Sequence, residues 1–192
     1  PSLMAVAHAS GDAAVPAEGK ARLVRKGDEF ALDAIAVHIG GSEVRGAIAV
    51  DAVDDFAVAG KLAVERMQAA MLLALSVGSA PAGKSFWPAA RLAPPPLAKT
   101  KGIVELDVKT LGLPGQLVAN GAALKLKLGP AEISIEDFSA ELAGGKLAGH
   151  ARFVRGDTLA FDGRATLDAF SVERLLASEE GKSGVRGRGK LT

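Results

Sequence analysis

The chain has 192 residues, 48% of them hydrophobic and 23% charged, a balance that excludes an intrinsically disordered segment. Its net charge of +1 gives no electrostatic reason to expect a nucleic-acid partner, and the absence of cysteine excludes disulfide bonds and thiolate chemistry. No apolar run reaches the roughly 18 residues of a membrane-spanning helix, and no signal peptide opens the sequence. We expect the chain to be a segment of a longer protein.

In chain order, residues 1–77 predict a first unit of strands joined by a Gly-Gly turn and ending in a short helix near 65–76. Residues 78–101 are rich in Gly, Pro and Ala, which is typical of a linker. Residues 102–192 predict a second unit with a short helix near 171–180, after which the chain stops within a strand.

The second unit alternates apolar and polar residues most clearly, for example in "IVELDVK", "LKLKLG" and "LAFDGRATLD". A two-residue period predicts strands with one apolar and one polar face. In "AEISIEDFSAEL" the alternation changes phase at Glu136-Asp137, which predicts a bulge or bend there. The residues predicted to line the apolar face are Val104, Leu106, Val108, Leu124, Leu126, Ile133, Ile135, Leu159, Phe161 and Leu167.

Turn signals separate these runs at intervals of roughly 8 to 14 residues, which predicts an antiparallel meander. Two short helices are too few to cover about ten strands, and a membrane barrel is disfavoured because the chain has one Trp and no Tyr. The predicted fold is therefore mainly β: an elongated, curved antiparallel sheet that forms an open groove. An ordinary sandwich, in which two sheets bury their apolar faces against each other, is the alternative.

The sequence also repeats. The stretch from Gly46 aligns without gaps with the stretch from Gly149, so that Gly60 meets Gly163 and Val64 meets Leu167. Upstream, "AVHIGGSEVRG" matches "SAELAGGKLAG" with one residue inserted. A unit that cannot bury its apolar face alone usually stacks on copies of itself, so we expect two repeats.

The stretch "IEDFSAELAGGKLAGHARFVRGDTLAFDGRATLDAFSVERLL" resembles the C-terminal region of the AsmA family of bacterial envelope proteins, and "FWPAARLAPPPLAKTKGIVELDV" resembles that family's Trp-containing linker. The resemblance covers most of residues 29–192. It implies curved β-sheets that form a groove, anchored at the inner membrane by segments outside this chain and projecting into the periplasm. It also implies a role similar to that of bridge-like lipid-transfer proteins, and it brings no catalytic residues.

Residues Gly78–Ser85, "GSAPAGKS", match the phosphate-binding pattern GxxxxGKS. The pattern needs a buried strand before it and a helix after it. The preceding "QAAMLLALSV" aligns with the second unit's helix, and Pro88 and Pro94–Pro96 follow closely. We therefore expect a linker here and no bound nucleotide.

No other residues form a catalytic or metal-binding pattern. The three histidines, His8, His38 and His150, do not share a helical turn with a second ligand type, and adjacent carboxylates on a strand point to opposite faces. We assign no catalytic, metal-binding or cofactor-binding residue, and we do not expect an enzyme.

The function predicted is shielding of phospholipid acyl chains by the apolar groove, in support of phospholipid transport between the inner and outer membranes and of outer-membrane homeostasis. The alternative is a scaffold or assembly factor of the envelope that binds polypeptide by adding a strand to an exposed sheet edge.

Overall fold

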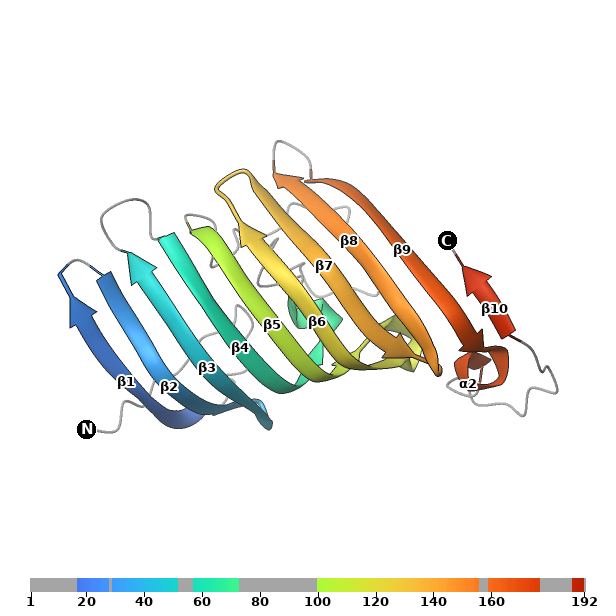
Figure 1. Cartoon of the computed structure of the whole chain (residues 1–192), viewed down its shortest axis with the longest axis horizontal. Helices are drawn as coiled ribbons and strands as arrows, with labels where there is room; N and C mark the ends of the chain where they lie inside the picture. The colour runs from blue at the N-terminus through green and yellow to red at the C-terminus, as the bar shows by residue number, and fades with distance from the viewer. Residues whose placement is uncertain are drawn as a thin grey trace.

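The structure is a computed structural model that describes residues 17–27, 29–51, 57–72, 100–155, 159–176 and 188–191. The fold is mainly β, and these residues form one ten-stranded sheet in which the strands lie side by side in chain order (Figure 1). Most connections between consecutive strands are short, and strands joined by tight turns pair with each other, which explains most of this order. The strands are β1 (Ala17–Lys26), β2 (Glu29–Ile39), β3 (Ser42–Asp51), β4 (Ala57–Gln68), β5 (Lys101–Gly112), β6 (Val118–Leu128), β7 (Glu132–Leu142), β8 (Gly145–Arg155), β9 (Leu159–Ser171) and β10 (Arg188–Leu191).

One pair breaks the predicted antiparallel meander. Strands β4 and β5 are parallel, with Ala57 opposite Lys101 and Gln68 opposite Gly112, whereas all other neighbouring pairs are antiparallel. Parallel neighbours need a connection of a dozen or more residues, and the stretch between these two strands is long enough. The sheet is therefore mostly antiparallel, and it continues without a break from the predicted first unit into the second.

The predicted bulge in β7 is confirmed. Asp137 has a φ of 52°, and the pairing of β7 with β8 shifts register between Ile135 and Phe138. The extra residue turns the second half of β7 over, so that Ile133 and Phe138 both face the apolar side. Phe138 and Ala140 pack against the same cluster as Ile133.

The two parts of the sequence that align also share strand register. Ala34 in β2 has a φ of 52°, and β2 shifts register against β3 between Leu32 and Ile35. Ala34 lies 103 residues before Asp137. The register shift between residues 32 and 35 likewise lies 103 residues before the shift between residues 135 and 138. In both places the bulge is followed by a glycine on the next strand, because Ile35 pairs with Gly46 and Phe138 pairs with Gly149.

The hairpin turns agree as well. Gly40 and Gly41 connect β2 to β3 with φ values of 58° and 78°, and Ala143 and Gly144 connect β7 to β8 with φ values of 51° and 77°. Two consecutive residues with positive φ are typical of the type I′ turn, whose twist matches that of the paired strands. Glycine occupies both positions of the first turn and the second position of the other, in which Ala143 also adopts a left-handed backbone.

Helices are short. The helix predicted near 65–76 begins later than expected, because Glu65–Gln68 belong to β4 and only residues 69–72 are helical within the described range. Helix α2 (Val172–Leu176) follows β9 directly, and a 3₁₀ turn (Pro114–Gln116) connects β5 to β6. The described helices lie at strand ends, so among the described elements the sheet has no second layer of comparable size (Figure 1). Most of the predicted linker 78–101 lies outside the described residues.

Candidate functional site

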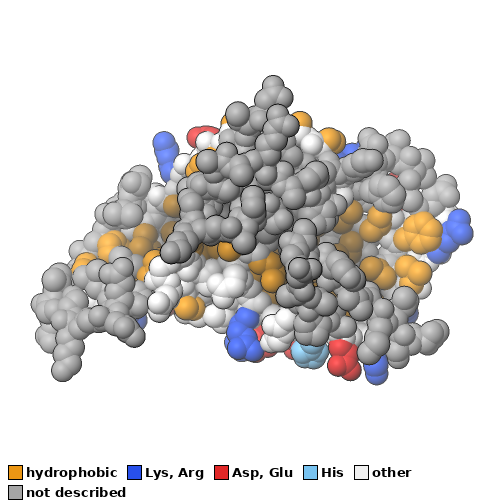
Figure 2. Space-filling view, turned by 180° about the vertical axis from the view of Figure 1, so that it is seen from behind, with side chains coloured by type: hydrophobic (Ala, Val, Ile, Leu, Met, Phe, Trp, Pro, Cys, Tyr) orange, Lys and Arg blue, Asp and Glu red, His pale blue; other side chains and the backbone are white. Residues whose placement is uncertain are grey.

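The apolar face of the sheet is the candidate site. Alternate residues of β4 to β7 and of β9 point to this face, and together they form one hydrophobic cluster. Figure 2 shows hydrophobic side chains on this face at both ends of the sheet, with Lys, Arg, Asp and Glu at its margins. The arrangement separates an apolar from a charged face across the whole sheet.

Most of the predicted lining residues lie together in this cluster, and they are buried. Ile133 and Val108 have exposed fractions of 0% and 1%. Ile135 is half-buried and packs against the cluster. The other predicted residues buried in the cluster are Val104, Leu106, Leu124, Leu126 and Leu167.

Two predicted lining residues are not among the described members of the buried cluster. Phe161 is 52% exposed on β9, and its ring centroid is 5.1 Å from that of the buried Phe153 on β8. Leu159 pairs with Arg155 at the start of β9, and its side chain lies outside the described residues. At the other end of the sheet Leu23 is 62% exposed, opposite Leu32 on β2. The apolar face is therefore buried in the middle and exposed at both ends.

Sequence reasoning missed part of this cluster. Val64 on β4 lies next to a stretch that was predicted to be helical, so its strand neighbours were not identified. Ala119 and Ala122 are almost fully buried on β6 although alanine carries little signal in a pattern of alternation. The alternation of β4, "AVAGKLAVERMQ", holds the signal that identifies Val64. The missed members are Val64, Leu72, Leu111, Ala119, Ala122, Leu128, Leu142 and Phe170.

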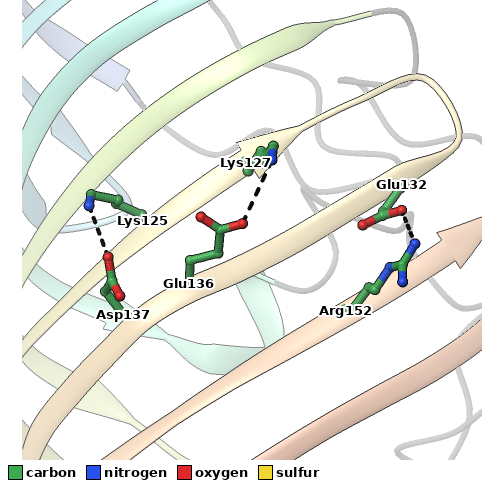
Figure 3. A network of polar contacts seen from close by, with 6 residues as sticks. All are labelled: Lys125, Lys127, Glu132, Glu136, Asp137 and Arg152. Carbon is green, nitrogen blue, oxygen red and sulfur yellow. Dashed lines mark hydrogen bonds and ion pairs between the residues drawn. The ribbon is translucent and has the colours of Figure 1, made fainter.

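The opposite face carries ion pairs between neighbouring strands (Figure 3). Lys125 Nζ lies 2.9 Å from Asp137 Oδ2, and Lys127 Nζ lies 3.9 Å from Glu136 Oε1. The hydrogen bond that Lys125 donates to Asp137 raises the pKa of the lysine. Because of the bulge, Glu136 and Asp137 both lie on this charged face, contrary to the expectation that adjacent carboxylates on a strand point to opposite faces. Each forms an ion pair with a different lysine of β6.

Strands β4 and β5 are connected by a second group of charges. Lys61 Nζ lies 2.9 Å from Asp107 Oδ2 and 3.8 Å from Glu105 Oε2. The hydrogen bond to Asp107 is the main reason that the pKa of Lys61 is raised. One lysine on β4 therefore meets two carboxylates that alternate along β5.

The ion pair between Arg152 and Glu132 predicts that the stability of the fold depends on pH. Arg152 Nη2 donates a hydrogen bond of 2.5 Å to Glu132 Oε2, which lowers the pKa of Glu132 below its ordinary value of 4.5. The pair therefore stabilises the fold above this value, and its contribution disappears as the pH falls through the lowered pKa. We expect Glu132→Gln to lower the urea midpoint slightly at about pH 6, and we expect this effect to shrink as the pH falls through the lowered pKa of Glu132.

The control is Glu141→Gln, because Glu141 is exposed on the same strand and forms no ion pair with a described residue. An equal pH dependence of both variants would contradict the assignment to the Arg152 pair.

A shallow depression of about 510 Å³ lies beside the bulge of β7. Its charged and titratable members are Glu136, Asp137, His150 and Arg164, and Lys127 and Lys125 already pair with the two carboxylates. Among the described residues no group of three His, Cys, Asp or Glu side chains converges to hold a metal ion. We assign no chemical step to this depression.

The structure bears only in part on two features of the sequence, the phosphate-binding pattern and the absence of a long apolar helix. Gly78–Ser85 lie outside the described residues. Within the described part of the chain, no helix has both the length and the apolar character needed to cross a membrane.

No family model, no curated protein and no solved structure matches the chain.

Proposed function

We propose that this chain is a segment of an AsmA-like periplasmic protein whose apolar sheet face shields phospholipid acyl chains during transport between the inner and outer membranes. The observation that carries the proposal is the one-sided sheet, in which strands β4 to β9 contribute to one apolar cluster. The sequence resemblance described above supports the family and the periplasmic location, with a membrane anchor outside this chain.

The dimensions and the energetics support an acyl chain as the ligand. Strands are spaced about 4.8 Å apart, so nine full-length strands extend over about 40 Å, more than the roughly 15 Å hydrocarbon thickness of one leaflet. Moving a 16-carbon chain into water costs roughly 13 kcal/mol at about 0.8 kcal/mol per methylene. Contacts with Val, Leu and Ile remove most of this cost, whereas the charged face remains in water.

Binding in this proposal begins at the exposed ends of the face. Leu23 and Phe161 are more than half exposed, whereas Ile133 is fully buried. An acyl chain in this proposal first contacts the apolar side chains at these exposed ends.

We also propose that β1–β4 and β6–β9 are two copies of one structural unit. The common spacing of 103 residues between the bulges, between the glycines that oppose them and between the turns supports this proposal. A unit of this kind extends the apolar face by repetition, as transport across an envelope requires.

Photo-crosslinking tests the proposed function. A benzophenone amino acid at Phe161 is expected to form lipid adducts when the protein is irradiated with vesicles of phosphatidylethanolamine and phosphatidylglycerol. The matched control is Ile103, which is 47% exposed beside Lys127 on the charged face and is expected to give few adducts. Equal lipid labelling at both positions would contradict the proposal, and adducts with protein alone would favour the alternative scaffold.

A further inference from the structure

The sequence contains a single asparagine, Asn120, and it is followed directly by Gly121. Both residues belong to β6, which lies inside the sheet between β5 and β7 (Figure 1). Asparagine is chemically labile, and a following glycine makes it more so because glycine has no Cβ to hinder its own main-chain nitrogen. The structure around this dipeptide therefore decides how stable the Asn120 side chain is.

Strand β6 is irregular at this dipeptide. Asn120 and Gly121 are both exposed, and they lie between the buried Ala119 and Ala122, so one extra residue interrupts the alternation of faces. The pairing of β6 with β7 shifts register between Asn120 and Ala123. Gly121 has a φ of 58°, and it is paired with no residue of β5 or β7. The dipeptide is therefore part of a bulge in an otherwise paired strand.

The bulge leaves room for a ring to form between the two residues. A Cβ placed on Gly121 would meet no atom within 4 Å. In a regular strand, main-chain hydrogen bonds hold the peptide unit that follows an asparagine, and they must open before its nitrogen can turn toward the side chain. Within the described sheet Gly121 has no paired position of this kind.

We propose that Asn120 is a site of spontaneous deamidation, with water as the co-reactant. The main-chain nitrogen of Gly121 forms a bond to Cγ of Asn120, and the bond between Cγ and Nδ2 breaks. The proton of the attacking nitrogen goes to the departing amide group, which leaves as ammonia. Water then opens the succinimide ring at one of its two carbonyls. Opening at one carbonyl gives aspartate, and opening at the other gives isoaspartate, in which the main chain runs through the side-chain carbon.

The products change β6 in two ways. Asn120 lies opposite Glu141 of β7, so a carboxylate at position 120 places like charges on directly opposed residues. Isoaspartate also adds one main-chain carbon before the buried Ala122 and Leu124, which shifts both residues relative to their partners on β5. We therefore expect the isoaspartate form to unfold at a lower urea concentration than the parent chain.

Incubation of the whole chain in mildly alkaline buffer, followed by proteolysis and mass spectrometry, tests the proposal. The peptide that contains residue 120 is expected to gain the mass difference between an amide and an acid, and to separate into two products by chromatography. The same incubation in guanidinium chloride gives the rate for the unfolded chain. We expect the folded chain to react within roughly tenfold of that rate, because few main-chain hydrogen bonds have to open.

The matched control is Asp162→Asn, which creates a second Asn-Gly dipeptide in a strand. Asp162 and Gly163 are also exposed, but they lie in the regular ladder, opposite Arg152 and Ala151 of β8. Each main-chain hydrogen bond that must open first slows the reaction by roughly two- to tenfold. The introduced asparagine is therefore expected to react more slowly than Asn120 in the folded chain, and at a similar rate in guanidinium chloride.

Equal rates for Asn120 and the introduced asparagine in the folded chain would overturn the proposal. It would also be overturned if Asn120 kept its amide in the folded chain while the unfolded chain reacted. The variant Asn120→Asp has the new charge without the extra main-chain carbon, so its urea midpoint is expected between those of the parent chain and the isoaspartate form. The proposal does not depend on lipid binding, because these incubations contain no lipid.

Discussion

Replacing Ile133 with alanine is expected to lower the free energy of unfolding by about 2–5 kcal/mol. Ile133 is fully buried on β7 in the middle of the hydrophobic cluster. The substitution removes buried methyl and methylene groups and leaves a cavity, and both effects destabilise the folded state. Urea unfolding followed by circular dichroism measures the change.

The matched control is Ile103→Ala. Ile103 is the same residue type, also in the middle part of the sheet, but it is 47% exposed on the charged face. A substitution there is expected to change the free energy of unfolding by less than about 1 kcal/mol. Similar losses for both variants would contradict the assignment of the two faces, on which the site depends.

Deletion of Asp137 is expected to destabilise the protein by roughly 4–6 kcal/mol, which approaches the whole stability of a typical domain. Asp137 is the extra residue of the bulge in β7. Without it, one half of the strand must turn to the wrong face, so that either Ile133 or Leu142 leaves the cluster for water. The measurement is again urea unfolding, with near-ultraviolet circular dichroism to detect lost packing.

The variant Asp137→Gly distinguishes the contribution of the bulge to stability from that of the Asp137 side chain. Glycine adopts a φ of 52° without strain, whereas other residues pay about 1 kcal/mol or more for a left-handed backbone. The variant keeps the residue count and loses the exposed ion pair with Lys125, so its stability is expected to stay within about 1 kcal/mol of the parent chain. A loss as large as that of the deletion would show that the side chain, rather than the bulge, is what matters.

Local alternation predicted much of the fold. Charged residues between Val104, Leu106 and Val108 predicted a strand with two different faces, and the change of phase at Glu136-Asp137 predicted the bulge. Both predictions succeed because side chains in a strand point alternately to opposite faces, so a pattern within ten residues carries the information.

The helix near 65–76 was predicted less well. "ERMQAAMLL" is apolar at spacings that suit a helix, but Glu65–Gln68 belong to β4, and Arg66, Met67 and Gln68 pair with β5. Their partners, Thr110, Leu111 and Gly112, lie more than forty residues later in the chain. Nonlocal pairing overrides local propensity here.

The amino-acid sequence by itself determined most of the strands, which side of them is apolar and where the alternation changes phase, because these properties depend on neighbours within a few residues. Only the tertiary structure decided that β5 lies parallel to β4 and that the middle of the apolar face is buried while Leu23 and Phe161 remain exposed. These features depend on which distant segments meet, and strand pairing and burial are set by contacts between residues far apart in the chain.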